Sequence, residues 1–193
     1  MGKNQKCLSH STLVIQMPSN FEEFLSEFMR TRAISHSLEM LSANKQWIKE
    51  LIVCSGTEDQ KRADYSSWLL THFAISFPEI LDQEATPLFE NVQRTAFDGT
   101  RRNLLKTLTF LPLRVNETSH MFDFCLTIIA DPKQKVAAQV YALQYLGTIC
   151  QAYPELKNET LIIVNEQVGK YSRAMEYTIK KFILSNKSSQ NNN

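Results

Sequence analysis

Apolar residues recur along this chain at intervals of three and four positions, which is the spacing of one face of an α-helix. Residues 131–156 show this pattern most clearly, with two neighbouring apolar stripes. Asp131 and Pro132 suit the cap and the first turn of a helix, and Pro154 suits its end. Because the two stripes together cover more than half of the helix surface, the pattern predicts a long helix packed on two sides.

The same period predicts helices along most of the remaining chain. Capping signals mark several starts, namely Ser19 with Glu22, Asn44, Thr57 with Gln60, Thr86 with Pro87, and Asp98. Further helices are expected over residues 33–41, 117–130, 154–168 and 170–184. Short β-branched runs such as LIVC and TLIIV lie inside helical periods, so no strand is expected. We expect a flexible segment at 1–18, a single domain at 19–185 and a disordered polar tail at 186–193.

The long helices align with one another, with one shorter apolar helix between successive copies. At steps of 40, 36 and 36 residues the aligned columns are Lys61, Arg101, Ala137 and Arg173; Tyr65, Leu105, Tyr141 and Tyr177; Ser67, Thr107, Leu143 and Ile179; and Leu70, Phe110, Leu146 and Phe182. A helix pair that repeats at this interval is typical of an α-solenoid. The predicted fold class is therefore all-α, an α-solenoid of antiparallel helix pairs.

The stretch DPKQKVAAQVYALQYLG resembles a HEAT-type repeat, in which Asp-Pro opens the second helix and an Ala-rich run ends in Leu-Gly. The matching residues are Asp131, Pro132, Val136, Ala142, Leu146 and Gly147. Ala137 departs from the pattern, because HEAT repeats usually carry a basic residue there. The resemblance covers about residues 33–185 and extends to a group of small bacterial HEAT-like proteins. It implies a right-handed stack of helix pairs, related to armadillo-type solenoids, and it implies no ligand.

Composition narrows the classes of partner. The net charge is +1, which argues against a dedicated nucleic-acid binder, because phosphate contacts require clustered basic charge. No apolar run approaches the roughly 18 residues that a membrane span needs, and no signal peptide is recognisable. Cys54, Cys125 and Cys150 lie in apolar stretches, which favours buried free thiols in a reducing compartment. We therefore expect a cytoplasmic protein.

No pattern for catalysis or for metal binding emerges. The four histidines show no metal-ligand spacing with one another or with cysteine, and no phosphate-binding glycine loop, HExxH or GxSxG occurs. Acidic residues are scattered near expected helix ends, where they complement helix dipoles. We therefore expect no cofactor, no metal and no catalytic residues.

One set of side chains is a candidate interaction surface on the concave face of the solenoid. It consists of Lys61, Arg62, Tyr65, Trp68, Arg101, Arg102 and Arg173. The basic members would suit an acidic partner. The alternative is structural, since such cations commonly form ion pairs within or between repeats, and such aromatic residues commonly pack on the core.

Two functions follow from these observations. The first is a non-enzymatic repeat module that binds another protein through its concave face. The alternative is DNA binding, because HEAT-like alkylpurine DNA glycosylases share the architecture implied by the resemblance. The residues here that are of the types their grooves use are Arg62, Arg101, Arg102, Arg173, Trp68 and Asp64. Helical lyases of the fumarase superfamily are a weaker comparison, because their Gly-Ser-Ser signature loop is absent.

Overall fold

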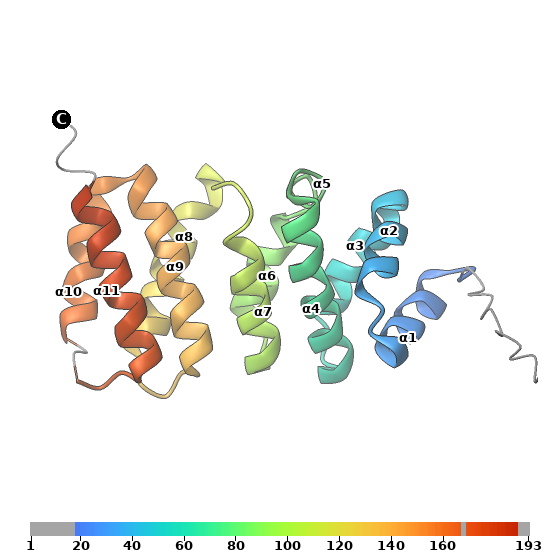
Figure 1. Cartoon of the computed structure of the whole chain (residues 1–193), viewed down its shortest axis with the longest axis horizontal. Coiled ribbons are helices and arrows are strands. Elements are labelled where there is room, and N and C mark those ends of the chain that lie inside the picture. Colours follow the sequence, from blue (N-terminus) through green and yellow to red (C-terminus); the bar gives the residue numbers. More distant parts are fainter. Residues whose placement is uncertain (1–17, 167–168, 189–193) are drawn as a thin grey trace, which may run out of the picture.

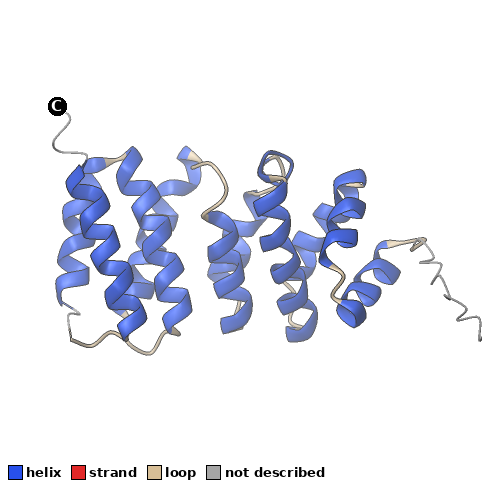
Figure 2. Cartoon of the chain, in the orientation of Figure 1, coloured by secondary structure: helices blue, strands red, loops and turns tan. Residues whose placement is uncertain are grey.

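The computed structural model describes residues 18–166 and 169–188. Within these ranges the chain forms α-helices, one short 3₁₀ helix and no strand (Figures 1 and 2). The helices are α1 (Phe21–Thr31), α2 (Ile34–Ala43), α3 (Lys45–Ser55), α4 (Gln60–Ser76), α5 (Pro78–Asp82), α6 (Thr86–Arg94), α7 (Asp98–Leu108), α8 (Val115–Ala130), α9 (Val136–Ala152), α10 (Lys157–Glu166) and α11 (Arg173–Ser188), with the 3₁₀ helix η1 at Pro154–Leu156.

The helices lie in two layers that run the length of the molecule (Figure 1). The first helix of each pair contributes to one layer, formed by α3, α6, α8 and α10, and the second helix contributes to the other, formed by α4, α7, α9 and α11. Successive long helices in a layer pack side by side. This arrangement is an all-α solenoid of antiparallel helix pairs, and it confirms the predicted fold class.

Helices α1 and α2 close the N-terminal end of the stack. Phe24 of α1 stacks on Trp47 of α3 with ring centres 5.0 Å apart. Phe28 of α1 lies 5.5 Å from Trp68 of α4, measured between ring centres. Since a terminal repeat has no neighbour to cover its apolar side, these aromatic contacts supply the cover that an adjoining pair would give.

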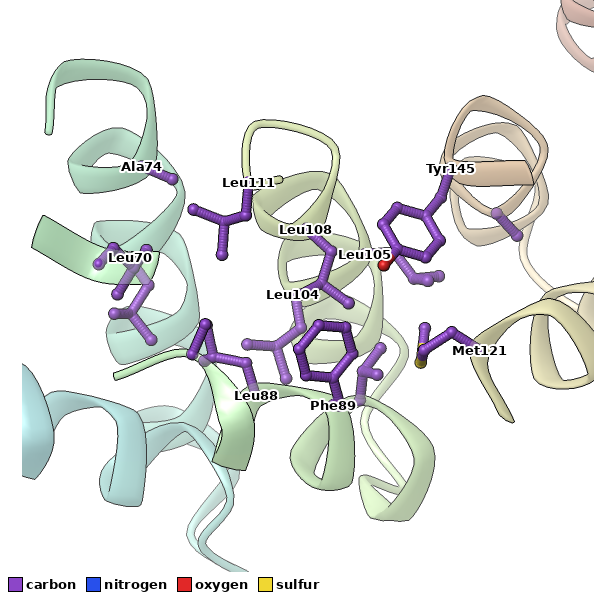
Figure 3. Packing of buried hydrophobic residues seen from close by; sticks show 14 of the residues in the cluster. Leu70, Ala74, Leu88, Phe89, Leu104, Leu105, Leu108, Leu111, Met121 and Tyr145 are labelled. Carbon is purple, nitrogen blue, oxygen red and sulfur yellow. The ribbon is translucent and has the colours of Figure 1, made fainter. Parts of the chain in front are cut away.

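The apolar core runs between the two layers (Figure 3). Leu88 and Phe89 of α6 point toward Leu104 and Leu108 of α7, and all four are at most 2% exposed. Each such side chain contributes about 1.5–3 kcal/mol when fully buried. Tyr145 of α9 is also buried, and burial raises the pKa of its hydroxyl.

The contact between α4 and α7 is polar as well as apolar. Asp64 accepts a 2.8 Å hydrogen bond from Thr100, and Asn103 donates to Ser67 at 3.1 Å. The Thr71 and Thr107 hydroxyl oxygens lie 3.0 Å apart. Each of these three pairs is 36 residues apart in sequence, and we call them the polar ladder.

The helix expected to start at Asp131 starts later. α9 begins at Val136, whereas Asp131 ends α8 and receives hydrogen bonds from the Lys133 backbone (2.9 Å) and the Gln134 side chain (3.1 Å). Those contacts hold residues 131–135 in a turn, because an Asp side chain that bonds to nearby backbone competes with the helix. The predicted end is confirmed, since Ala152 is the last residue of α9 and Pro154 follows.

Three predicted caps are also displaced. Asp98 is the first residue of α7 and not its cap, because the N-cap position is held by Phe97. Asn20, not Ser19, caps α1, and its side chain accepts a 3.0 Å hydrogen bond from the Glu23 backbone. Asp59, not Thr57, caps α4, and its side chain accepts a 3.1 Å hydrogen bond from the Arg62 backbone N–H. At α4 the stronger capping residue lies two positions after the predicted Thr57, whereas at α1 Asn20 and Ser19 are capping residues of similar strength.

The aligned columns agree only in part with burial. Ser67, Thr107, Leu143 and Ile179 are all buried. In the column of Leu70, however, Phe110 is 40% exposed, because α7 ends at Leu108 before reaching it. The predicted flexible segment 1–18 lies outside the described residues except for Pro18, as do residues 167–168. α11 continues to Ser188, and the remainder of the predicted tail lies outside the described residues.

Candidate functional site

The side of α4, α7, α9 and α11 that faces away from the other layer carries three of the seven predicted interaction residues, namely Tyr65, Trp68 and Arg102. We call it the second-helix face. Its half-buried or exposed members are Tyr65, Trp68 and His72 of α4, Arg102 and Lys106 of α7, Val140, Tyr141 and Gln144 of α9, and Tyr177 and Lys181 of α11. This face is where we expect the concave side of the solenoid.

An aromatic row lies on α4, because residues three and four positions apart share one helix face. Tyr65 and Trp68 meet edge to face at 6.2 Å, and Trp68 meets His72 at 5.4 Å. Phe28 of α1 packs against the rings of both Tyr65 and Trp68. The pKa of His72 lies below 6.5, mainly because burial disfavours the charged imidazole and secondarily because Lys106 repels it. Both effects favour the neutral form of the His72 imidazole.

Arg32 approaches this row from the turn between α1 and α2. Its Nη2 donates to the Tyr65 hydroxyl at 2.9 Å, and its Cζ lies 5.6 Å from the Tyr65 ring centre. The Arg32 backbone has φ 55° and ψ 32°, the left-handed conformation that an L-residue other than Gly, Asn or Asp rarely adopts. Arg32 is not among the predicted interaction residues, since nothing in the neighbouring sequence signals a positive φ.

A pocket of about 320 Å³ opens beside the aromatic row. It is lined by Arg32, Asp64, Tyr65, Trp68, Gly99, Arg102 and Asn103. Arg32 and Arg102 are exposed cations at the rim, and Asp64 is held by Thr100. Gly99 leaves room for that carboxylate, because a Cβ there would lie 2.8 Å from Asp64 Oδ1. We call this the arginine pocket.

A larger groove of about 500 Å³ lies between α9 and α11. Its walls are Val140, Leu143, Gln144, Gly147, Thr148 and Gln151 of α9, and Ala174, Tyr177, Thr178, Lys181 and Phe182 of α11. Tyr177 is 60% exposed, and the Lys181 ammonium lies 4.9 Å from its ring centre. We call this the apolar groove, because one lysine is its only charged lining residue.

The predicted basic column does not form one continuous ladder. Arg62 makes a bidentate ion pair with Glu22 of α1, with both N–O distances 2.8 Å, and also donates to the Cys54 sulfur at 3.3 Å. Arg101 donates to the Thr95 carbonyl oxygen. These two cations therefore serve the fold, which is the structural alternative. Arg102 lines the arginine pocket, and Lys61 and Arg173 are exposed near the N-terminal ends of α4 and α11.

The net charge of +1 conceals a difference between the layers. The helices α4, α7, α9 and α11 carry nine Lys and Arg residues against three Asp and Glu, whereas α3, α6, α8 and α10 carry four against six. The layer that bears the second-helix face is therefore positive and the other is slightly negative. α9 contributes no charged residue to this balance.

Several residues of this face escaped the sequence analysis although a local signal existed. Lys106 follows Arg102 by four positions and lies 5.9 Å from the Tyr141 ring centre. Lys181 follows Tyr177 by four positions. Such spacing places two side chains on one helix face, so the Tyr177–Lys181 pair was readable from sequence, whereas the contact of Lys106 with Tyr141 on another helix was not.

In the part of the chain that the structure describes, no three His, Cys, Asp or Glu side chains are grouped to hold a metal ion. Among the same residues, no helix combines the length and the apolar content required to cross a membrane. Cys54, Cys125 and Cys150 are buried and free, as predicted, and burial raises the pKa of the Cys125 thiol far above its ordinary value.

The two-layer stack of antiparallel pairs, with its half-exposed residues gathered on the second helices, defines an α-solenoid. The family model described as a HEAT repeat domain matches residues 21–186, which is most of the chain. The chain therefore belongs to the HEAT repeat domain family. No curated protein and no solved structure matches it significantly.

Proposed function

We propose that this HEAT repeat protein is a non-enzymatic scaffold that binds another protein through its second-helix face. The observation that carries the proposal is the concentration of half-exposed aromatic and cationic side chains on that face, in the more positive of the two layers. Aromatic residues and arginine are the side chains that protein interfaces favour.

The grouping of ionisable residues supports binding rather than catalysis. In the arginine pocket the single carboxylate, Asp64, already accepts a hydrogen bond from Thr100, and its neighbours are arginines. His72 lies against the ring of Trp68. Neither contact supplies the paired acid and base that general acid–base chemistry uses.

Affinity capture tests the proposal. The full chain would be used as bait in lysate of its source organism, with and without crosslinker, next to the variant Arg102→Glu/Lys106→Glu and the control Lys45→Glu/Lys49→Glu. The control makes the same charge change on α3, in the other layer. We expect specific partners that the first variant loses and the control retains. Absence of any partner under crosslinking, or equal capture by both variants, would refute the proposal.

Nucleic-acid binding is the second candidate, because the arginine pocket combines two guanidinium groups with Tyr65 and Trp68. Cations that contact phosphates and aromatic rings that stack on bases are the usual components of single-strand and groove binding. An electrophoretic shift with duplex and single-stranded DNA at low and moderate salt tests it. No shift at low salt eliminates this candidate.

A further inference from the structure

We infer that the partner segment is an extended acidic peptide, with a carboxylate between Arg32 and Arg102 and an apolar side chain, about six residues away, in the apolar groove. This inference rests on the proposed protein-binding function and names the chemistry of the partner. Three features support it: the arginine pocket, the uncharged surface of α9 and the distance between the two sites.

The arginine pocket suits a carboxylate. Arg32 and Arg102 are both exposed and line the same pocket, and guanidinium groups bind carboxylates with paired, charge-assisted hydrogen bonds. The negative charge of Asp64 is directed to Thr100, which donates to Oδ1 at 2.8 Å. Two cations against one engaged carboxylate leave the pocket with a charge that attracts an acidic side chain.

The backbone of Arg32 is a second and independent observation. Its φ of 55° costs about 1 kcal/mol relative to glycine at the same position. A glycine would also let the cap form, because the contact that closes α1 is made by the backbone, from Arg32 N–H to the Phe28 carbonyl at 2.8 Å. Arginine, unlike glycine, places a guanidinium at the rim of the arginine pocket, where it donates to the Tyr65 hydroxyl at 2.9 Å.

The apolar groove suits an aliphatic or aromatic side chain. Val140, Leu143 and Phe182 supply apolar lining, and Gly147, which has no side chain, lines the groove with backbone only. The groove volume of about 500 Å³ exceeds that of one side chain. A branched aliphatic or aromatic side chain of the peptide therefore fits in it and displaces water from it. Lys181 at the edge offers a partner for a further carboxylate.

The distance between the two sites sets the spacing of the peptide. The arginine pocket lies at α4 and α7, and the apolar groove lies at α9 and α11, so their centres are about two helix separations apart. Packed helices lie about 8–10 Å apart, which gives about 16–20 Å. An extended chain rises about 3.3 Å per residue, so five or six residues span the gap.

The middle of the path favours a peptide over a nucleic acid. α9 carries no charged residue, and its outer surface presents Val140, Tyr141 and Gln144. A polyphosphate that crosses from α7 to α11 would place phosphates over a helix without cations, where they gain nothing from charge neutralisation. A peptide places charges at the ends of the path and neutral residues in the middle, which matches the surface.

Fluorescence anisotropy with designed peptides tests the inference. The probe is a labelled peptide of about 12 residues with a Glu pair and a Leu about six positions apart, in both orders, on a Ser and Asn background. The control peptide has the same composition with the Leu next to the Glu pair. We expect the spaced peptide to bind about tenfold more tightly than the control, a difference of about 1.4 kcal/mol.

Protein variants assign the two ends of the peptide. Arg102→Glu and Ala174→Trp, which blocks the groove, are each expected to weaken binding about tenfold. Lys45→Glu, the same charge change on α3, should leave it unchanged. Arg32→Gly should also weaken binding about tenfold while melting near the wild-type temperature, because relief of backbone strain offsets the lost Tyr65 hydrogen bond. This last variant separates binding from folding.

Three outcomes would overturn the inference. The first is equal binding of the spaced and control peptides, or binding of neither. The second is a labelled DNA duplex that binds more tightly than the spaced peptide at moderate salt and loses affinity in Arg102→Glu. The third is unchanged peptide binding in both Arg32→Gly and Ala174→Trp. If the peptides fail while affinity capture still depends on Arg102 and Lys106, the inference is wrong and the scaffold proposal stands.

Discussion

The hydroxyl oxygens of Thr71 and Thr107 lie 3.0 Å apart between α4 and α7, and both hydroxyls also contact the Asn103 carbonyl oxygen. Both residues are buried. They form the innermost rung of the polar ladder, where a sequence pattern would place an aliphatic pair. The α4–α7 contact is therefore fixed by hydrogen bonds of defined geometry as well as by apolar packing.

A double-mutant cycle measures this rung. Thr71→Val and Thr107→Val should each lower the free energy of unfolding by about 1 kcal/mol, because each leaves a buried hydroxyl with fewer partners. The double variant should cost less than the two single variants together, since a Val pair needs no hydrogen bond. Urea unfolding measures all four proteins. Strict additivity would mean that the two hydroxyls do not interact.

The Arg62–Glu22 pair should affect folding and not binding. Arg62→Gln is expected to reduce stability by less than about 1 kcal/mol at pH 7, because exposed ion pairs contribute little. The Arg62 hydrogen bonds lower the pKa of Glu22 below 4.5. That contribution is fully present above pH 4.5 and is lost as the pH falls through the lowered pKa, so the two proteins should converge in acid. Peptide affinity should equal that of the wild type, in contrast to Arg102→Glu.

His72 should make stability depend on pH. Its pKa in the folded protein lies below 6.5, so the unfolded chain binds a proton first as the pH falls. Stability should therefore decrease from above pH 6.5 down through the lowered pKa of His72. The variant His72→Gln should show a smaller decrease in melting temperature over the same range.

A second variant assigns the cause of that shift. Lys106→Met removes the repelling charge and should raise the pKa of His72, although burial still holds it below 6.5. Histidine NMR titration of the wild type and of Lys106→Met measures both values. An unshifted His72 resonance in the wild type would contradict the prediction.

Gly56 and Gly147 should respond in opposite ways to alanine. A Cβ at Gly56 would lie 2.3 Å from the side-chain oxygen of Asn91, whose amide donates to the Ile52 carbonyl at 2.8 Å. Gly56→Ala must displace this buried amide, and we expect a loss of about 1–3 kcal/mol. At Gly147 the nearest atom is 3.6 Å away, on Phe182, so Gly147→Ala should stabilise α9 by up to about 1 kcal/mol. Thermal unfolding of the two variants and of the wild type measures both changes in stability.

The helical periods were readable because burial on one or two sides leaves a regular apolar pattern. The ends of α4 and α9 were predictable from Pro78 and Pro154, because the residue before a proline disfavours the helical conformation. The start of α9 was not, because Asp131 satisfies its side chain within the turn instead of capping the helix. Gly56 was expected to end α3 and does, yet with φ −103° and through close contact with Asn91.

The candidate site was harder to predict than the fold. Trp68 and Arg102 were both assigned to the candidate surface and both line the arginine pocket, but the predicted step of 40 residues aligned Trp68 with Leu108, which is buried. Arg62 has the same residue type as Arg102 and aligns with it in the predicted register, but it forms an ion pair with Glu22, 40 residues earlier. A long-range partner of this kind leaves no trace in helical spacing. Arg32 could be recognised only once the turn between α1 and α2 had brought it against Tyr65.

The unequal charge of the two layers gives this nearly neutral molecule an electric dipole across its thickness. Near its isoelectric point, about pH 7.7, it should still adhere to a sulfonate resin, since that resin meets the positive layer alone. In dilute buffer, one molecule's positive layer attracts another's negative layer, so the particle size measured by light scattering should grow with protein concentration. Added salt should reverse this growth, because it screens charges beyond about 10 Å at 0.1 M.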